Sequence, residues 1–125
     1  MKIAVLVARI LLGLMFLLFG LNGFHDFLHM PMPSGPAGQY LGLLFVSHYL
    51  TVVYFIEAAG GLLLLTGQFV PLALVLIGPV VFNILLFHTF LFPSGFPPAI
   101  LATVLWFIVF FGHRSAFAGI FAQKA

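Results

Sequence analysis

Four apolar segments dominate this chain, at about residues 3–24, 49–66, 69–92 and 99–112. A helix needs about 20 apolar residues to cross the hydrocarbon core of a bilayer, which is ~30 Å thick. Hydrophobic residues make up 64% of the sequence and charged residues only 5%, whereas roughly a quarter of the residues in a soluble domain are charged. The sequence therefore predicts an all-α membrane protein, with one domain over residues 1–125 and four transmembrane helices in an antiparallel bundle.

The first segment could in principle be a cleaved signal peptide rather than a membrane helix. A signal peptide has an uninterrupted apolar region followed by a cleavage site of small residues. Here Arg9 divides the apolar region, and no such site follows Gly23. We therefore expect this segment to be retained as the first membrane helix.

The segments between the expected spans contain most of the prolines. Three prolines lie within His25–Gln39, which is expected to be an extramembrane loop. The following stretch, Tyr40–Val46, is too short to span and is expected to form a short interfacial helix. Thr66–Gln68 predicts a tight turn between antiparallel neighbours, and Pro79 is expected to kink the third span.

Only four lysine and arginine residues occur in the chain: Lys2, Arg9, Arg114 and Lys124. With four crossings, all of them fall on the side that holds both termini, and basic residues are retained in the cytoplasm. We therefore expect a multi-pass protein of the bacterial inner (plasma) membrane with cytoplasmic termini. So few scattered cations exclude a nucleic-acid-binding surface. The absence of cysteine excludes thiol chemistry, iron–sulfur clusters and thiolate zinc sites.

The first two expected spans each carry one charged residue on a face of small residues. At about 100° per residue, the positions that align with Arg9 are Gly13, Phe16, Gly20 and Gly23. In the second span, Gly60 and Gly61 follow Glu57 by one turn. These faces are expected to pack together. Arg9 and Glu57 lie ~10 and ~15 Å from the cytoplasmic ends, so we predict a structural ion pair. A ligand-binding carboxylate and a proton relay at Glu57 are the alternatives.

The third span and the outer loops contain further polar residues. Pro79 deprives the carbonyl of Val75 of its usual donor, and Asn83, one turn later, is expected to form an interhelical hydrogen bond. The histidines His25, His29, His48 and His88, together with Asp26, are expected to gather at the outer interface. They could serve only as amphipathic residues at the interface, which is the favoured interpretation, or they could bind zinc or copper, exchange a proton, or hydrogen-bond a quinone carbonyl. Their spacing matches no compact metal-binding motif, and haem held between His48 and His88 is the less favoured alternative.

The order of these residues resembles the DoxX family of small four-helix bacterial membrane proteins. The matching positions are Arg9, Gly13, Phe16 and Gly20, then Glu57, Gly60 and Gly61, then Pro79, Asn83 and His88. The resemblance extends from Val7 to about Phe117. The family includes a small subunit associated with thiosulfate:quinone oxidation and partners of redox or stress-response membrane assemblies. The resemblance therefore implies a quinone-facing or accessory role.

We expect a non-catalytic or quinone-proximal accessory subunit that contacts the lipid bilayer and a larger membrane complex, or that forms a homo-oligomer. The alternative is a small proton-coupled transporter with Glu57 as the exchanged site. A third hypothesis is an enzyme acting on a quinone or a small sulfur species, although no nucleophile and base spacing supports it. Any small ligand is expected between His48, His88 and the Pro79 kink, with Asn83 and His25 as further candidate contacts.

Overall fold

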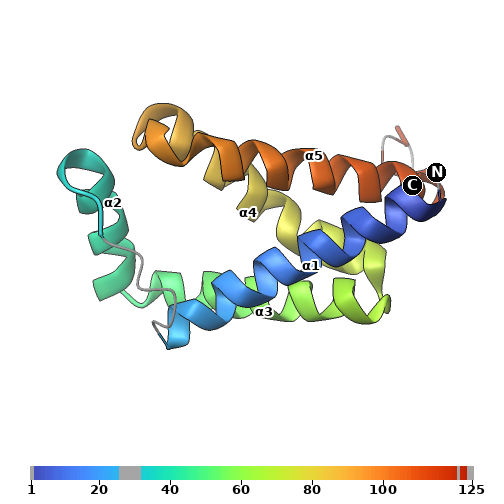
Figure 1. Cartoon of the computed structure of the whole chain (residues 1–125), viewed down its shortest axis with the longest axis horizontal. Coiled ribbons are helices and arrows are strands. Elements are labelled where there is room, and N and C mark those ends of the chain that lie inside the picture. The colour runs from blue at the N-terminus through green and yellow to red at the C-terminus, as the bar shows by residue number, and fades with distance from the viewer. Residues whose placement is uncertain (1, 26–31, 121, 124–125) are drawn as a thin grey trace.

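The computed structural model describes residues 2–25, 32–120 and 122–123, and these contain helices and turns but no strand. The helices are α1 (Lys2–Phe24), α2 (Gly35–Val46), α3 (Tyr49–Thr66), α4 (Val70–Phe90) and α5 (Phe96–Gly112), with short 3-10 turns η1 (Pro93–Gly95) and η2 (Arg114–Phe117) (Figure 1). In this part of the chain α1, α3, α4 and the segment Pro93–Gly112 are long and apolar enough to cross a membrane. The chain is thus a multi-pass membrane protein with the predicted fold.

Two helices begin earlier than the sequence pattern predicted, and proline is the reason in both cases. The short helix α2 begins at Gly35 rather than Tyr40, with Pro36 in its first turn. Likewise α5 begins at Phe96 rather than Ala99, again with proline in its first turn. The N–H groups of the first turn have no hydrogen-bond acceptor within the helix, so proline, which lacks an N–H, loses nothing there. Proline therefore favours the start of these two helices. The last five residues of the loop predicted over His25–Gln39 therefore belong to α2.

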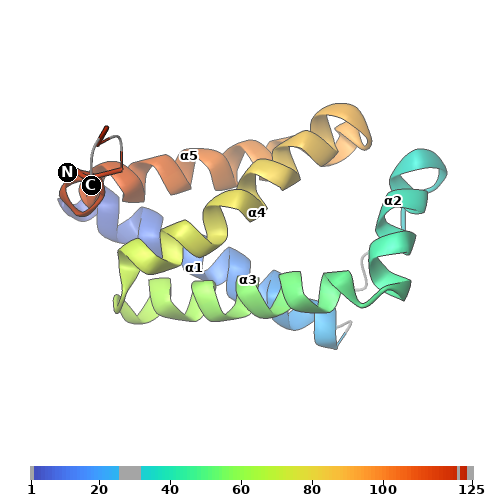
Figure 2. The same ribbon diagram turned by 180° about the vertical axis from the view of Figure 1, so that it is seen from behind.

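The four long helices form a closed ring in which α1 packs against α3 and α5, and α4 packs against α3 and α5 (Figures 1 and 2). The contact between α1 and α3 is the most extensive, and their backbones touch. A methyl group added to Gly20 would lie 2.5 Å from the backbone nitrogen of Ala58, and one added to Gly61 would lie 2.7 Å from the carbonyl oxygen of Gly13. The predicted packing of the two small-residue faces is confirmed.

The bundle has two different ends. We call the end with the start of α1, the α3–α4 turn and the end of α5 the terminal end, because both chain termini lie there; the opposite end, crossed by α2, is the α2 end (Figure 1). The buried apolar core extends from the terminal end to about the middle of the helices, and it consists of Ala8, Leu12, Phe16, Leu64, Val70, Ala73, Leu74, Ile77, Val81, Ala102, Leu105 and Val109. Towards the α2 end, the pair α4–α5 separates from the pair α1–α3 (Figures 1 and 2).

Two side-chain interactions connect these helices. One lies within the ring, and the other joins α2 to it. The indole nitrogen of Trp106 in α5 donates a hydrogen bond to the carbonyl oxygen of Leu74 in α4, at 3.1 Å. At the α2 end, the rings of Tyr40 in α2 and Phe87 in α4 are 5.8 Å apart. The helix α2 therefore contacts the end of α4 as well as α3.

Cysteine labelling tests the number of crossings. The chain has no cysteine of its own, so each variant would carry one thiol. Ser34 precedes α2 and Gln123 lies beyond α5, and both are exposed. We expect cysteines at these two positions to react with a membrane-impermeant maleimide from opposite sides, in intact spheroplasts and in inverted vesicles respectively. Labelling of both from one side would contradict four crossings.

Candidate functional site

The structure places Arg9 beside the α3–α4 turn. Its guanidinium group packs against Gly67, which ends α3 in a left-handed conformation with φ of 72°. A side chain at position 67 would be strained by this backbone conformation and would also collide with Arg9. Gly67 thus allows Arg9 to cover the turn at the terminal end of the bundle.

Arg9 and Glu57 are therefore not brought together. The guanidinium of Arg9 lies at Gly67, ten residues and ~15 Å along α3 from Glu57, and the Glu57 side chain alone is too short to span this distance. The expected ion pair rested on counting depth from the end of each helix. In the structure the α3–α4 turn is level with Arg9 rather than with the first residue of α1, because α1 extends beyond the turn.

Glu57 instead faces the interior of the ring, with only 6% of its surface exposed. One turn later on the same face, Gly60 packs against Ile77 of α4, and Gly61 packs against the backbone of α1 at Leu17. Glu57 thus belongs to the face of α3 that lies between α1 and α4. By this register it lies about level with Gly20 and Pro79, where the packed core ends and the helices begin to separate.

The carboxyl group of Glu57 has unused hydrogen-bonding capacity. It forms no hydrogen bond with any described residue. Among the described residues, every side-chain nitrogen or oxygen that is completely enclosed has a hydrogen-bond partner. The oxygens of Glu57 therefore still border open space although the residue is buried. A carboxyl group in this position can accept a hydrogen bond in either protonation state and can donate one when protonated.

Tyr54 is a second polar residue of this site, and sequence reasoning missed it. It precedes Glu57 by three residues, so both lie on one side of α3. The tyrosine ring covers Gly23 of α1 and meets Phe24 edge to face, with ring centroids 6.3 Å apart. The spacing of three residues from a buried acid was the signal in the sequence. We call Glu57 and Tyr54 the α3 polar pair.

Asn83 does not form the predicted interhelical hydrogen bond. Its amide nitrogen donates to the carbonyl oxygen of Pro79 in its own helix, at 2.9 Å, and the side chain is exposed. Val75, whose carbonyl loses its usual donor to Pro79, is also 54% exposed. The two positions lie on the lipid-facing side of α4, because the buried face of this helix is formed by Val70, Ala73, Leu74, Ile77 and Val81.

The histidines do not converge on one site. The Nδ1–H of His88 donates to the carbonyl oxygen of Phe92 at 2.9 Å, and the ring rests on Gly95 in the α4–α5 turn. His48 is exposed and has a left-handed conformation at the α2–α3 junction, with φ of 64°. Figure 1 shows this junction and the α4–α5 turn at opposite corners of the α2 end. His48 and His88 therefore do not face each other across one ligand.

The remaining outer residues add no further cluster. His25 is exposed at the end of α1, whereas Asp26 and His29 lie outside the described residues. Within the described ranges, no three histidine, aspartate or glutamate side chains gather as metal ligands would. The chain matches no protein-family model, no curated protein and no solved structure.

Proposed function

We propose that this chain is a DoxX-like accessory subunit of a larger redox complex in the bacterial inner membrane, non-catalytic by itself and close to a quinone. Its termini face the cytoplasm in this proposal, because Lys2, Arg9 and Arg114 lie at the terminal end and basic residues are retained on the cytoplasmic side. The polar groups on the lipid-facing side of α4 support the accessory role. The α3 polar pair supports the proximity to a quinone.

The exposed amide of Asn83 is the observation that carries the accessory role. Asn83 follows Val70 by 13 residues and precedes Phe90 by seven, so it lies ~20 Å and ~10 Å from the two ends of α4, within the hydrocarbon. One amide hydrogen is donated to Pro79, and the amide oxygen and the second hydrogen have no partner among the described residues. Lipid offers neither group a partner, whereas a polar contact from another membrane helix would satisfy both.

Replacing Asn83 with leucine is expected to release the chain from its complex. In mild detergent the native chain should migrate on a native gel far above the 13.7 kDa of one copy, and the leucine variant should shift towards the size of a single chain. Single polar contacts between membrane helices contribute about 0.6 kcal/mol on average and up to ~1.7, so we expect a loss of roughly three- to twentyfold in assembled protein.

Phe82→Leu is the matched control, because Phe82 is 61% exposed beside Asn83 and carries no polar group. It should leave the assembly intact. Mass spectrometry of the assembly distinguishes a foreign subunit from additional copies of this chain. A native chain that migrates as a single copy, or an assembly that contains only this chain, would contradict the accessory role.

The α3 polar pair has the chemistry to hold a quinone head group. A quinone carbonyl accepts hydrogen bonds, and a protonated carboxyl group and a phenol can each donate one. By the register of α3, both residues lie towards the α2 end of the packed core, where the helices separate (Figure 1). This location replaces the expected position between His48 and His88, since those two side chains do not face each other.

A proton-coupled transporter is the second candidate function, and it is specifically favoured because Glu57 is buried with no described lysine or arginine beside it. A carboxyl group that no arginine or lysine neutralises can gain and lose a proton during transport more readily than one held in an ion pair. Such a transporter would require Glu57 to titrate, whereas quinone binding requires only its hydrogen bonds. Glu57→Gln therefore separates the two functions.

A further inference from the structure

The helix α2 bridges the two helix pairs of the ring where they separate. Its C-terminal end leads through Ser47 and His48 into α3, against which α2 also packs. Midway along α2, the ring of Tyr40 lies against the ring of Phe87 in α4. Because α3 belongs to the pair α1–α3 and α4 belongs to the pair α4–α5, α2 crosses the opening between the two pairs (Figures 1 and 2).

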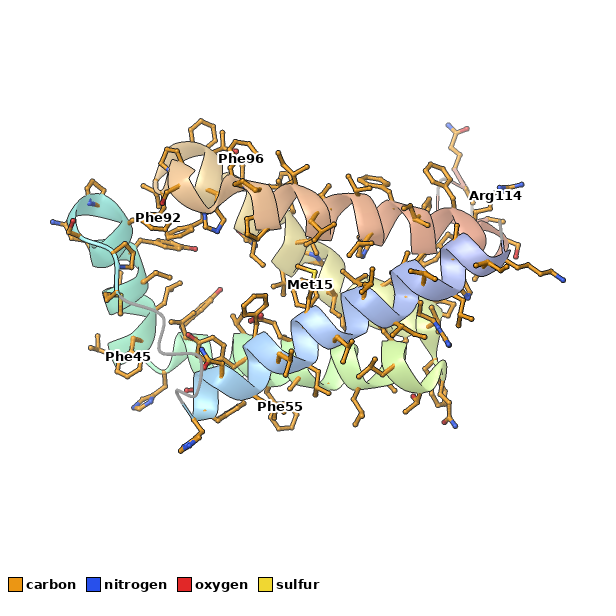
Figure 3. The ribbon with its side chains drawn as sticks, viewed as in Figure 1. Met15, Phe45, Phe55, Phe92, Phe96 and Arg114 are labelled. Carbon is orange, nitrogen blue, oxygen red and sulfur yellow. The ribbon has the colours of Figure 1, made fainter. Side chains whose placement is uncertain are left out.

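The attachment of α2 to α4 is a small cluster of aromatic rings. Besides the contact with Tyr40, Phe87 meets Phe92 with ring centroids 6.1 Å apart. Figure 3 shows Phe92 at the α4–α5 turn, on the side that faces α2, and Phe45 at the other end of α2, beside α3. Of the residues in α2 only Ala37 is buried, whereas each of the four long helices buries at least four residues. The helix α2 is therefore held more loosely than the others.

The junction between α2 and α3 contains a strained residue. His48 has a left-handed backbone conformation, with φ of 64°, and this conformation is unfavourable for a residue with a side chain. Its N–H donates a hydrogen bond to the carbonyl oxygen of Phe45 at 3.2 Å, which closes a tight turn. A rotation of α2 that returns His48 to an ordinary conformation would release this strain, so His48 is suited to act as a hinge.

The membrane removes the main force that would oppose such a rotation. In water, a helix that leaves its neighbour exposes apolar surface at a large cost, but lipid is as apolar as the side chains that it would cover. Leu43 and Val46 of α2 are already exposed and apolar. The helix α2 can therefore exchange its contact with Phe87 for contacts with lipid.

We propose that α2 is a movable strap: by turning about His48 it leaves Phe87 and opens the α2 end of the bundle, so that a ligand from the bilayer reaches the α3 polar pair. Tyr54 and Glu57 follow the first residue of α3 by five and eight residues, which places them ~8 and ~12 Å along the helix from that end. The strap therefore lies between the pair and the nearer membrane interface. The identity of the ligand rests on the function proposed above, whereas the movement of α2 and the access to Glu57 do not.

Chemical modification of Glu57 tests the strap without any assumption about the ligand. Glu57 is one of two acidic residues in the chain, and an apolar carbodiimide reacts with protonated carboxyl groups from within the bilayer. Mass spectrometry of peptides from the full chain in proteoliposomes gives the rate of modification at Glu57.

A cross-link between α2 and α4 supplies the closed form for this measurement. The chain has no cysteine, so Tyr40→Cys together with Phe87→Cys introduces only two thiols. Joined by a short bifunctional maleimide, these thiols fix α2 to α4; capped separately with N-ethylmaleimide, they leave α2 free. We expect Glu57 to be modified severalfold more slowly in the linked protein than in the capped protein.

Single substitutions test the contact with Phe87 and the hinge. Tyr40→Ala should raise the rate of modification by roughly two- to tenfold, the change in population expected from the loss of one aromatic pair. Phe45→Ala is the matched control, because Phe45 is also an exposed aromatic residue of α2 but has no ring contact among the described residues. His48→Pro fixes φ at about −65° and so excludes the left-handed conformation of the junction, and it should raise the rate as well.

Spin labels on cysteines at Leu43 and Phe90 measure the movement directly, since both positions are exposed. The distance between the labels should lengthen in Tyr40→Ala and in His48→Pro, but not in Phe45→Ala. An unchanged distance in the first two variants, or equal modification rates in the linked and capped proteins, would overturn the proposal. If those rates differ but the chain binds no quinone analogue, the strap is supported and the proposed quinone function is contradicted.

Discussion

Replacing Gly61 with valine is expected to force α1 away from α3 and to lower the unfolding temperature of the detergent-solubilised protein by on the order of 10 °C. The added side chain would meet the backbone nitrogen of Leu17 and the carbonyl oxygen of Gly13. Flexible side chains can rotate away from an overpacked position, but a neighbouring backbone cannot. The whole helix must therefore move, and the most extensive contact that α1 makes is lost.

Gly42→Val is the matched control for this prediction. Gly42 is also in a helix, α2, and a methyl group there would meet nothing within 4 Å. Both variants carry the same β-branched side chain in a helix interior, so the difference between their unfolding temperatures isolates the contact between α1 and α3. Thermal unfolding followed by size-exclusion chromatography would measure it. Equal unfolding temperatures for the two variants would show that the backbones of α1 and α3 do not touch as described.

The close approach of α1 and α3 could be predicted from the sequence because it depends on local spacing alone. Gly13 and Gly20 recur at helical intervals, and Gly61 lies on a comparable face of the next span. A helical period fixes which residues share a face before any tertiary structure is known. The apolar segments predicted the four spans for the same reason, since their length and composition are properties of the chain itself.

The partner of Arg9 could not be predicted, because it depends on how far one helix slides along another. Depth counted from the helix ends assumed that α1 and α3 end at the same level. In the structure Arg9 is level with Gly67, and a displacement of a few residues is enough to separate an arginine from a glutamate. The residues between the spans do not specify that displacement, and packing between the glycines of the two helices sets it instead.

The direction of Asn83 and the positions of the histidines were unpredictable for related reasons. Pro79 and Asn83 lie one turn apart, which identifies a shared face, but the sequence does not say whether this face meets lipid or another helix. His48 and His88 belong to the two junctions at the α2 end. Their separation depends on where α2 crosses the bundle, and a helix of this length can be placed in several ways.

Substitutions of Glu57 are expected to have the largest effect on ligand binding, and they separate the two proposed functions. Glu57→Leu removes both hydrogen-bonding oxygens from the α3 polar pair. A hydrogen bond lost in a buried site costs about 1–3 kcal/mol, so the affinity of the purified chain for a short-chain quinone analogue should fall by roughly tenfold or more. Glu57→Gln keeps a donor and an acceptor of the same shape, and its affinity should remain within about threefold of the native value.

The transporter hypothesis predicts the opposite ranking, because an amide cannot carry a proton. In proteoliposomes with an imposed pH gradient, Glu57→Gln should then abolish coupled uptake as completely as Glu57→Leu.

Two further variants locate the quinone site within the bundle. Tyr54→Phe should weaken quinone binding while keeping the ring over Gly23, whereas His88→Ala should leave it unchanged, because the Nδ1–H of His88 is already donated to Phe92. Native affinity in the Glu57→Leu protein would exclude the α3 polar pair as the quinone site, and loss of affinity only in His88→Ala would move the site to the α4–α5 turn.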